Sequence, residues 1–211
     1  MGLKVSNVGV YGFQYAIKAL KRFYNSNLSS SSETISFGDG YIPNKNDLAI
    51  MRTHVKESNS KAKFTRFIQV YFDVDAPLHW WLAFKDYKIG VEKITDPINK
   101  KLFKEPLTIN SFDVDKEIPE CVQIINKVIE GINPLITLYN TSNAAESKRA
   151  IVRKIKMVLP HSFIISGTIT TNYQTLRSIC LDRKESKSDE WISFHQFIES
   201  LPYAEFLISA D

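Results

Sequence analysis

Residues 67–75, FIQVYFDVD, alternate between apolar and polar side chains. A period of two places alternate side chains on opposite faces of a strand. One face would present Ile68, Val70, Phe72 and Val74, and the other Gln69, Tyr71 and Asp73. The segment therefore predicts a half-buried β-strand, the clearest in the chain.

Two more segments, 3–11 and 163–171, read as strands, and the second is rich in β-branched residues. Apolar residues at helical spacing predict helices elsewhere, and one of these begins at Pro77 and ends near Gly90. The predicted helices are 15–25, a segment from Asn46 through Val55, 77–90, 121–140, 148–160, 173–184 and 189–201. Strands interspersed with helices indicate an α/β or α+β fold with a central sheet and flanking helices.

Two segments interrupt this order. Residues 25–43 are rich in Ser, Gly and Asn and predict a flexible loop. Residues 91–118 are rich in Lys and contain Pro97 and Pro106, which favours an irregular, exposed segment. The length of 211 residues suits a single domain spanning 1–211.

Composition narrows the function classes. With 44% hydrophobic and 24% charged residues, the chain can bury a sizeable core. The net charge of +4 favours anionic small molecules but gives no strong nucleic-acid signal. Cys121 and Cys180 are far apart and the histidines lack ligand spacing, so we expect no metal site. No apolar run approaches the roughly 20 residues of a membrane span, and we expect a cytoplasmic protein.

The sequence lacks the glycine-rich dinucleotide fingerprint, the P-loop and the nucleophile elbow. A ligand site must therefore be assembled from side chains that the fold brings together. The aromatic segment APLHWWLAFKDYKIG, 76–90, is one source of such side chains. It is either a core helix or a stacking platform for a planar ring, with Tyr87 and Lys88 at its end and Lys88 available to a phosphate.

Two clusters of cations are further candidates. Arg149, Arg153 and Lys156 recur along one edge of the helix at 148–160. Arg183 and Lys184 end the helix at 173–184, where positive charge suits the helix dipole. Each cluster is either a solvated surface or a phosphate contact.

Two stretches, KFTRFIQVYFDVDAPLHWWLAFKDYKIG and TNYQTLRSICLDRKESKSDEWISFHQFIESLPY, resemble a set of uncharacterised phage and prophage proteins. Together with the segment KMVLP, they also resemble, more distantly, the flavin-dependent thymidylate synthases, the ThyX family. This second resemblance implies a homotetramer that binds FAD, dUMP, a folate methylene donor and NADPH and methylates uracil at C5.

The resemblance also implies roles for individual residues. Tyr87 and Lys88 stand where the family signature has a His and its second Arg, and they would contact the nucleotide. Lys156 and Arg183 match two phosphate-binding arginines. Asn172 matches an Asn of the flavin site. The expected ligand of these residues is a nucleotide such as dUMP.

The chain departs from the family signature elsewhere. Asp86 replaces its first Arg, Val91 replaces a Ser, and Lys63-Phe64-Thr65-Arg66 lacks the expected His. A carboxylate at position 86 repels the flavin phosphates that an Arg attracts. Three functions stay open: a diverged thymidylate synthase, a catalytically inactive nucleotide-binding or regulatory protein, and an interaction protein that keeps the fold.

Overall fold

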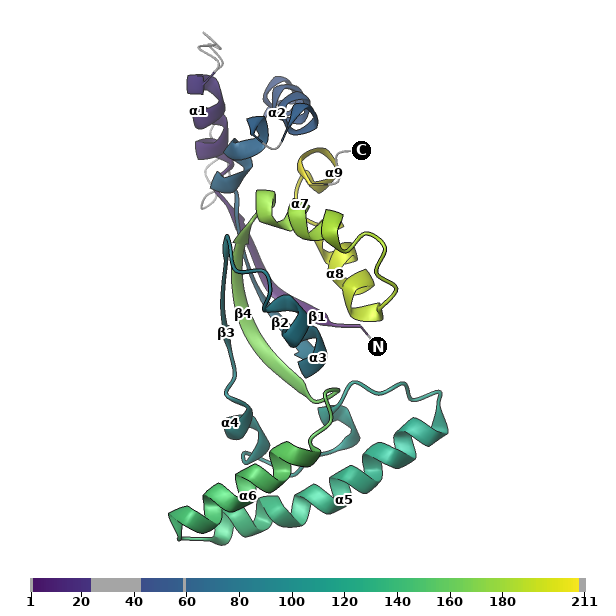
Figure 1. Ribbon diagram of the computed structural model, residues 1–211. Helices are drawn as coiled ribbons and strands as arrows, with labels where there is room; N and C mark the ends of the chain where they lie inside the picture. The colour runs from purple at the N-terminus through teal and green to yellow at the C-terminus, as the bar shows by residue number, and fades with distance from the viewer. Residues whose placement is uncertain (1, 24–42, 59, 209–211) are drawn as a thin grey trace. The chain divides into compact units, whose positions relative to one another are not determined.

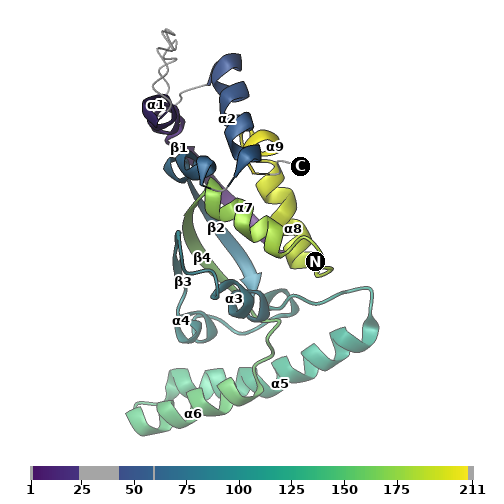
Figure 2. The same cartoon turned by 45° about the horizontal axis from the view of Figure 1, so that its top comes forward.

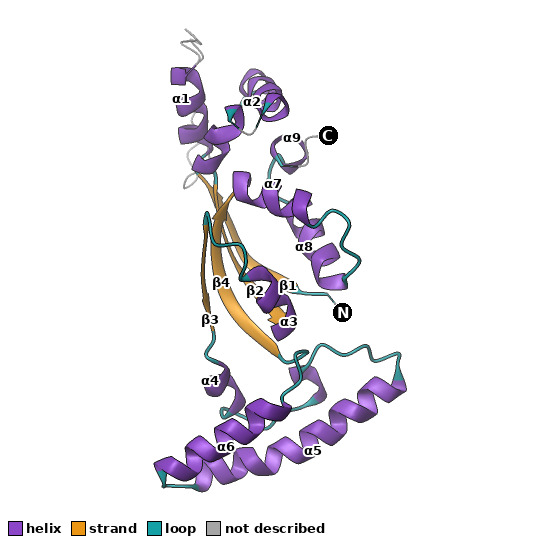
Figure 3. Cartoon of the chain, in the orientation of Figure 1, coloured by secondary structure: helices purple, strands orange, loops and turns teal. Residues whose placement is uncertain are grey.

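The computed structural model of the protein describes residues 2–23, 43–58 and 60–208 (Figures 1 and 3). The predicted Ser-rich loop lies almost wholly outside them. The strands are β1 (Lys4–Tyr11), β2 (Gln69–Pro77), β3 (Val91–Thr95) and β4 (Ile164–Asn172). The α-helices are α1 (Phe13–Phe23), α2 (Lys45–Glu57), α3 (Leu78–Phe84), α4 (Ile98–Leu102), α5 (Pro119–Thr141), α6 (Ala145–Val158), α7 (Tyr173–Asp182), α8 (Asp189–Glu199) and α9 (Ala204–Leu207), and the 3-10 helices are η1 (Lys61–Phe67) and η2 (Ile109–Ser111).

The strands form one sheet in the order β1-β2-β4-β3. The backbone N–H of Tyr173 donates to the carbonyl of Ile68, and that of Leu78 donates to the carbonyl of Phe163. Residue numbers rise along β2 as they fall along β4, so these two strands are antiparallel. The mixed fold with a central sheet and flanking helices, predicted from the order of elements, is confirmed.

The chain divides into two compact units, whose boundaries cross β1, β2, β3 and β4. Unit 1 holds α3, α4, η2, α5 and α6, and unit 2 holds α1, α2, η1, α7, α8 and α9. Unit 1 comprises Met1–Lys4, Val74–Asp86 and Ile94–Gly167, and unit 2 comprises Val5–Asp73, Tyr87–Lys93 and Thr168–Asp211.

In unit 2, α8 packs on the buried face of β2. The ring of Phe72 lies 6.1 Å from that of Phe194 and 4.8 Å from that of Phe197, measured between centroids. Tyr71, which precedes Phe72 on the strand, is 45% exposed. The alternation predicted for 67–75 is therefore confirmed, because burial of every second side chain drives this packing.

In unit 1, the aromatic residues of α3 form core. Trp80 stacks on Phe84 with 4.6 Å between centroids, and both side chains are buried. The Nε1 of Trp81 donates to the carbonyl of Ile165 at 3.2 Å. Gly167 makes room for this ring, because a Cβ there would lie 2.7 Å from it. The stacking-platform interpretation of the tryptophans is therefore wrong.

The helix predicted at 77–90 is also shorter than expected. It ends at Phe84, and a turn leads to Gly90, whose φ of +74° is in the left-handed region. A Cβ at Gly90 would lie 2.4 Å from the Oγ1 of Thr175. Glycine is thus required at the entry to β3 rather than as the end of a long helix.

Also in unit 1, α5 and α6 pack side by side as an antiparallel hairpin (Figures 1 and 2). The helix α5 runs unbroken through Gly131 and Pro134, where the sequence allowed a break. The Asn133 side chain ties it to the preceding segment by accepting from the N–H of Leu107 at 2.8 Å and donating to its carbonyl at 3.0 Å. The Lys-rich segment at 91–118, predicted to be irregular and exposed, contains β3, α4 and η2 joined by turns, and Leu102 and Leu107 in it are buried.

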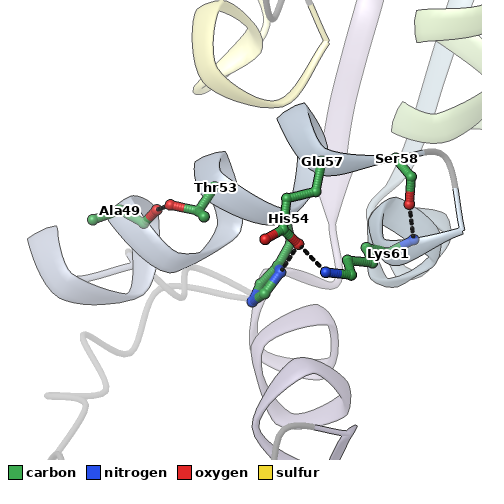
Figure 4. Close-up of polar contacts among 6 residues, drawn as sticks. All are labelled: Ala49, Thr53, His54, Glu57, Ser58 and Lys61. Atoms are coloured by element: carbon green, nitrogen blue, oxygen red, sulfur yellow. Dashed lines mark hydrogen bonds and ion pairs between the residues drawn. The ribbon is translucent and has the colours of Figure 1, made fainter.

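Polar contacts fix the end of α2 in unit 2 (Figure 4). The Oε2 of Glu57 lies 3.0 Å from the Nδ1 of His54 and 2.6 Å from the Nζ of Lys61. The Oγ of Ser58 accepts from the N–H of Lys61 at 3.2 Å. Hydrogen bonding to Lys61 and His54 lowers the pKa of Glu57. These contacts set the turn that leads from α2 into η1.

Among the helices that the structure describes, none is long and apolar enough to cross a membrane. The described residues likewise contain no group of His, Cys, Asp and Glu side chains suited to a metal ion. Cys121 is exposed, whereas burial raises the pKa of the Cys180 thiol to about 11. A protonated thiol is a poor nucleophile, so Cys180 offers no reactive group near neutral pH.

Candidate functional site

Three side chains of unit 2 surround the guanidinium of Arg183. The Nε of Arg183 donates to the Oη of Tyr87 at 2.8 Å, and the same hydroxyl donates to the Oδ2 of Asp182. The guanidinium carbon of Arg183 lies 4.6 Å from the ring centroid of Trp191 and 5.7 Å from that of Tyr87. The two rings are arranged edge to face. Arg183 is therefore held by cation–π contacts and a hydrogen bond.

Three different elements position this cluster. Tyr87 lies in the turn between α3 and β3, Arg183 is the C-cap of α7, and Trp191 lies in the first turn of α8. The N–H of Arg183 donates to the carbonyl of Ile179, and the Oγ of Ser188 accepts from the N–H of Trp191. Both helix ends are thus capped, which fixes the approach of the guanidinium to the ring.

The phenol of Tyr87 stays neutral. Burial, assisted by the hydrogen bond to Asp182, raises the pKa of Tyr87 to about 12. A neutral phenol can donate to the Asp182 carboxylate while it accepts from Arg183, as the geometry requires. Tyr87 is thus a bridge between an anion and a cation, and it orients both.

Arg183 retains unused donors. Its side chain is 31% exposed, and its Nε lies 3.5 Å from the Asp182 carboxylate. In the part of the chain that the structure describes, the two terminal guanidinium nitrogens have no hydrogen-bond or ion-pair partner. These nitrogens form a planar fork that matches a phosphate or carboxylate.

The other predicted site residues lie in different settings. Lys88 is exposed directly after Tyr87 in unit 2. Asn172 is 9% exposed, and its Oδ1 accepts from the N–H of Thr175 at 3.0 Å, so it is the N-cap of α7. Lys156 is exposed on α6 in unit 1. Tyr87, Lys88, Asn172 and Arg183 thus share one compact unit, and Lys156 belongs to the other.

Replacing Asn172 with Ala is expected to lower the free energy of unfolding by about 1 kcal/mol, because the cap of α7 is lost. Urea unfolding followed by circular dichroism measures this change. Asn172→Ser keeps a capping oxygen and is expected to restore most of the loss. Equal destabilisation by both substitutions would contradict a capping role.

As pH rises above about 10, a Tyr87→Phe variant is expected to lose less of its unfolding free energy than the wild type does. Because the folded-state pKa lies above the unfolded value, the contribution of Tyr87 is full below about pH 10 and disappears as pH rises through about 12. The difference in unfolding free energy between wild type and variant should therefore shrink across this interval. Tyr15→Phe, at an exposed position, is the control. A difference that is constant with pH would contradict the assignment.

The sequence did not point to Asp182 or Trp191 as site residues. Asp182 directly precedes Arg183, so the sequence shows that the two are close. Its contact with Tyr87 depends on the tertiary fold and cannot be read from the sequence. Trp191 lies eight positions after Arg183, across the connection from α7 to α8. An aromatic residue close to a candidate phosphate-binding Arg is the signal that would have found it.

Comparisons with known proteins bear on the fold. No protein-family model and no curated protein matches this sequence. Two solved structures of flavin-dependent thymidylate synthase ThyX from Helicobacter pylori, both with FAD and dUMP, do match, with TM-scores of 0.68 and 0.70 and 13% identity. They cover 100% and 99% of this chain, and 99% and 97% of their own. The chain has the ThyX fold.

A third structure with this likeness is the UMP/dUMP methylase PolB from Streptomyces cacaoi, bound with 5-Br UMP. Its TM-score is 0.52 at 11% identity, and the match covers 84% of this chain and 75% of that one. The fold implied by the sequence resemblance is therefore confirmed. At these identities the likeness to ThyX concerns the fold, and activity must be argued from the site.

Proposed function

We propose that this ThyX-fold protein acts in pyrimidine nucleotide metabolism by binding a uridine nucleotide such as dUMP, with Arg183 on the 5′-phosphate. The observation behind the proposal is the guanidinium of Arg183, which Tyr87 and Trp191 hold in place with its terminal nitrogens unpaired among the described residues. An immobilised fork loses little conformational entropy when it binds a phosphate. The H. pylori ThyX structures contain dUMP, which supports this choice of ligand.

Lys88 and Lys156 are the proposed additional phosphate contacts. Both side chains are exposed, and neither has an ion-pair partner among the described residues. Lys88 follows Tyr87 in the same turn, so it shares a compact unit with Arg183. Lys156 belongs to the other compact unit. We infer a homo-oligomer, a tetramer by resemblance.

The residues of this chain fit FAD less well than they fit a nucleoside monophosphate. Asp86, which stands in the place of an arginine, is exposed, and its carboxylate opposes a pyrophosphate. The amide oxygen of Asn172 is already used to cap α7. We therefore assign no step to a flavin. Binding of the nucleotide without methylation is the function that these side chains support best, and a diverged thymidylate synthase is the alternative.

Calorimetry with dUMP tests the binding proposal, with deoxyuridine as the matched ligand that lacks the phosphate. Heat from dUMP and none from deoxyuridine is the expected result, because the proposed contacts are to phosphate. Failure of every uridine nucleotide to bind would leave the interaction-protein interpretation in its place. The visible absorbance of the purified protein separates the alternatives: a flavin band supports the synthase, and a colourless protein that binds dUMP supports nucleotide binding alone.

A further inference from the structure

The helix α6 concentrates the positive charge of the chain. It contains five cationic residues between Lys148 and Lys156 and one carboxylate, Glu146, which gives a formal net charge of +4. The whole chain has the same net charge of +4, so the rest of the sequence is electrically balanced. The net positive charge of the chain is therefore located on a single helix, α6 of unit 1.

Three of these cations form a line, which we call the basic ridge: Arg149, Arg153 and Lys156. Residues four and three apart lie on one face of a helix, and the ridge spans about 10 Å along the axis. All three side chains are exposed. Within residues 2–23, 43–58 and 60–208, none of the three has an ion-pair or hydrogen-bond partner.

The packing of α6 keeps the ridge outward. Ile151 and Ile155, on the opposite side of the helix, are buried, and α6 packs against α5. Lys148, which is not part of the ridge, lies 4.9 Å from the ring centroid of Tyr139 on α5. The hairpin therefore orders the helix backbone before any ligand arrives, so binding does not have to fold the helix.

We propose that the basic ridge of α6 binds the phosphodiester backbone of a nucleic acid. Regularly spaced, unpaired cations on an ordered helix neutralise successive phosphates and release their counterions. No base-reading group is needed, so the binding is independent of sequence. The ridge shares Lys156 with the proposed nucleotide site, but Arg149 and Arg153 have no role in the proposed function, so a variant at these two arginines tests the ridge alone.

Fluorescence anisotropy with a short labelled DNA of mixed sequence, as single strand and as duplex, tests the proposal. Three phosphate contacts predict a slope of log K against log salt of about −2 for the single strand and about −3 for the duplex, measured between about 50 mM and 200 mM NaCl. Arg149→Gln/Arg153→Gln removes two contacts and is expected to weaken binding roughly 10-fold to 100-fold at 50 mM salt and to reduce the slope to about −1.

Lys100→Gln/Lys104→Gln is the matched control, because it removes two exposed positive charges of unit 1 that are not part of α6. It is expected to leave the affinity within about twofold of wild type. Equal weakening by both double variants, absence of binding to either DNA, or tighter binding to anionic lipid vesicles than to DNA would each overturn the proposal. The dUMP titration of the Arg149→Gln/Arg153→Gln protein should match wild type, which keeps this test independent of the proposed nucleotide site.

Discussion

Replacing Trp80 with Ala is expected to lower the free energy of unfolding by about 3–5 kcal/mol. The indole is 1% exposed and stacks on Phe84, so its removal loses both buried area and ring contact and leaves a cavity in unit 1. Urea unfolding followed by tryptophan fluorescence and circular dichroism measures the change.

The matched control is Leu82→Ala, on the same helix but 44% exposed. We expect it to cost less than about 1 kcal/mol, since little surface is buried there. If Trp80→Ala proved as mild as Leu82→Ala, the aromatic segment would not be core, and an exposed stacking role for it would have to be reconsidered.

Replacing Arg183 with Ala is expected to weaken dUMP binding by about 1.5–3 kcal/mol, which is more than tenfold in affinity. The variant removes the charged fork and also frees Tyr87 from its hydrogen bond. Calorimetry with dUMP measures the loss, and the unfolding transition of the variant shows whether unit 2 stays folded.

Two substitutions sharpen this test. Lys184→Ala removes the same charge at the next, exposed position and is expected to change dUMP affinity by less than about twofold, because screened surface charges contribute little. Arg183→Lys keeps the charge but loses the planar fork and is expected to recover only part of the affinity. An equal loss in Lys184→Ala would mean that the general field of the helix end, rather than a specific contact, attracts the ligand.

Local patterns predicted β1, β2 and β4, because each shows a short-range periodicity, but they missed β3, which lies in the segment 91–118 that was predicted to be irregular. The alternation at 67–75 reappears in β2, and the β-branched run at 163–171 reappears in β4. The end of α3 was missed because the apolar and aromatic residues continue at helical spacing beyond Phe84. What stops the helix is a turn that positions Gly90 at a positive φ, close to Thr175 on α7. That requirement comes from a residue far along the chain, so no local pattern contains it.

The candidate site was also predicted only in part: short motifs identified its residues, but not the contacts between them. Arg183 and Tyr87 were identified from a resemblance carried by short motifs around each of them. Their mutual contact joins residues 96 positions apart, and only the fold could bring them together. The flavin-site role that the resemblance implied for Asn172 stays a prediction, and the structure shows this residue as the N-cap of α7. For the tryptophans of α3 the sequence left a core role and a stacking platform open, and their burial decides for the core.

The carboxylate beside Arg183 has a consequence for any ligand. Asp182 is the chain neighbour of Arg183, so its carboxylate stays beside the guanidinium at any protein concentration. The terminal nitrogens of Arg183 attract an incoming phosphate while this carboxylate repels it, so the net attraction is weaker than that of an isolated guanidinium. The affinity of Arg183 for a phosphate therefore depends on how far the Asp182 carboxylate already neutralises the guanidinium.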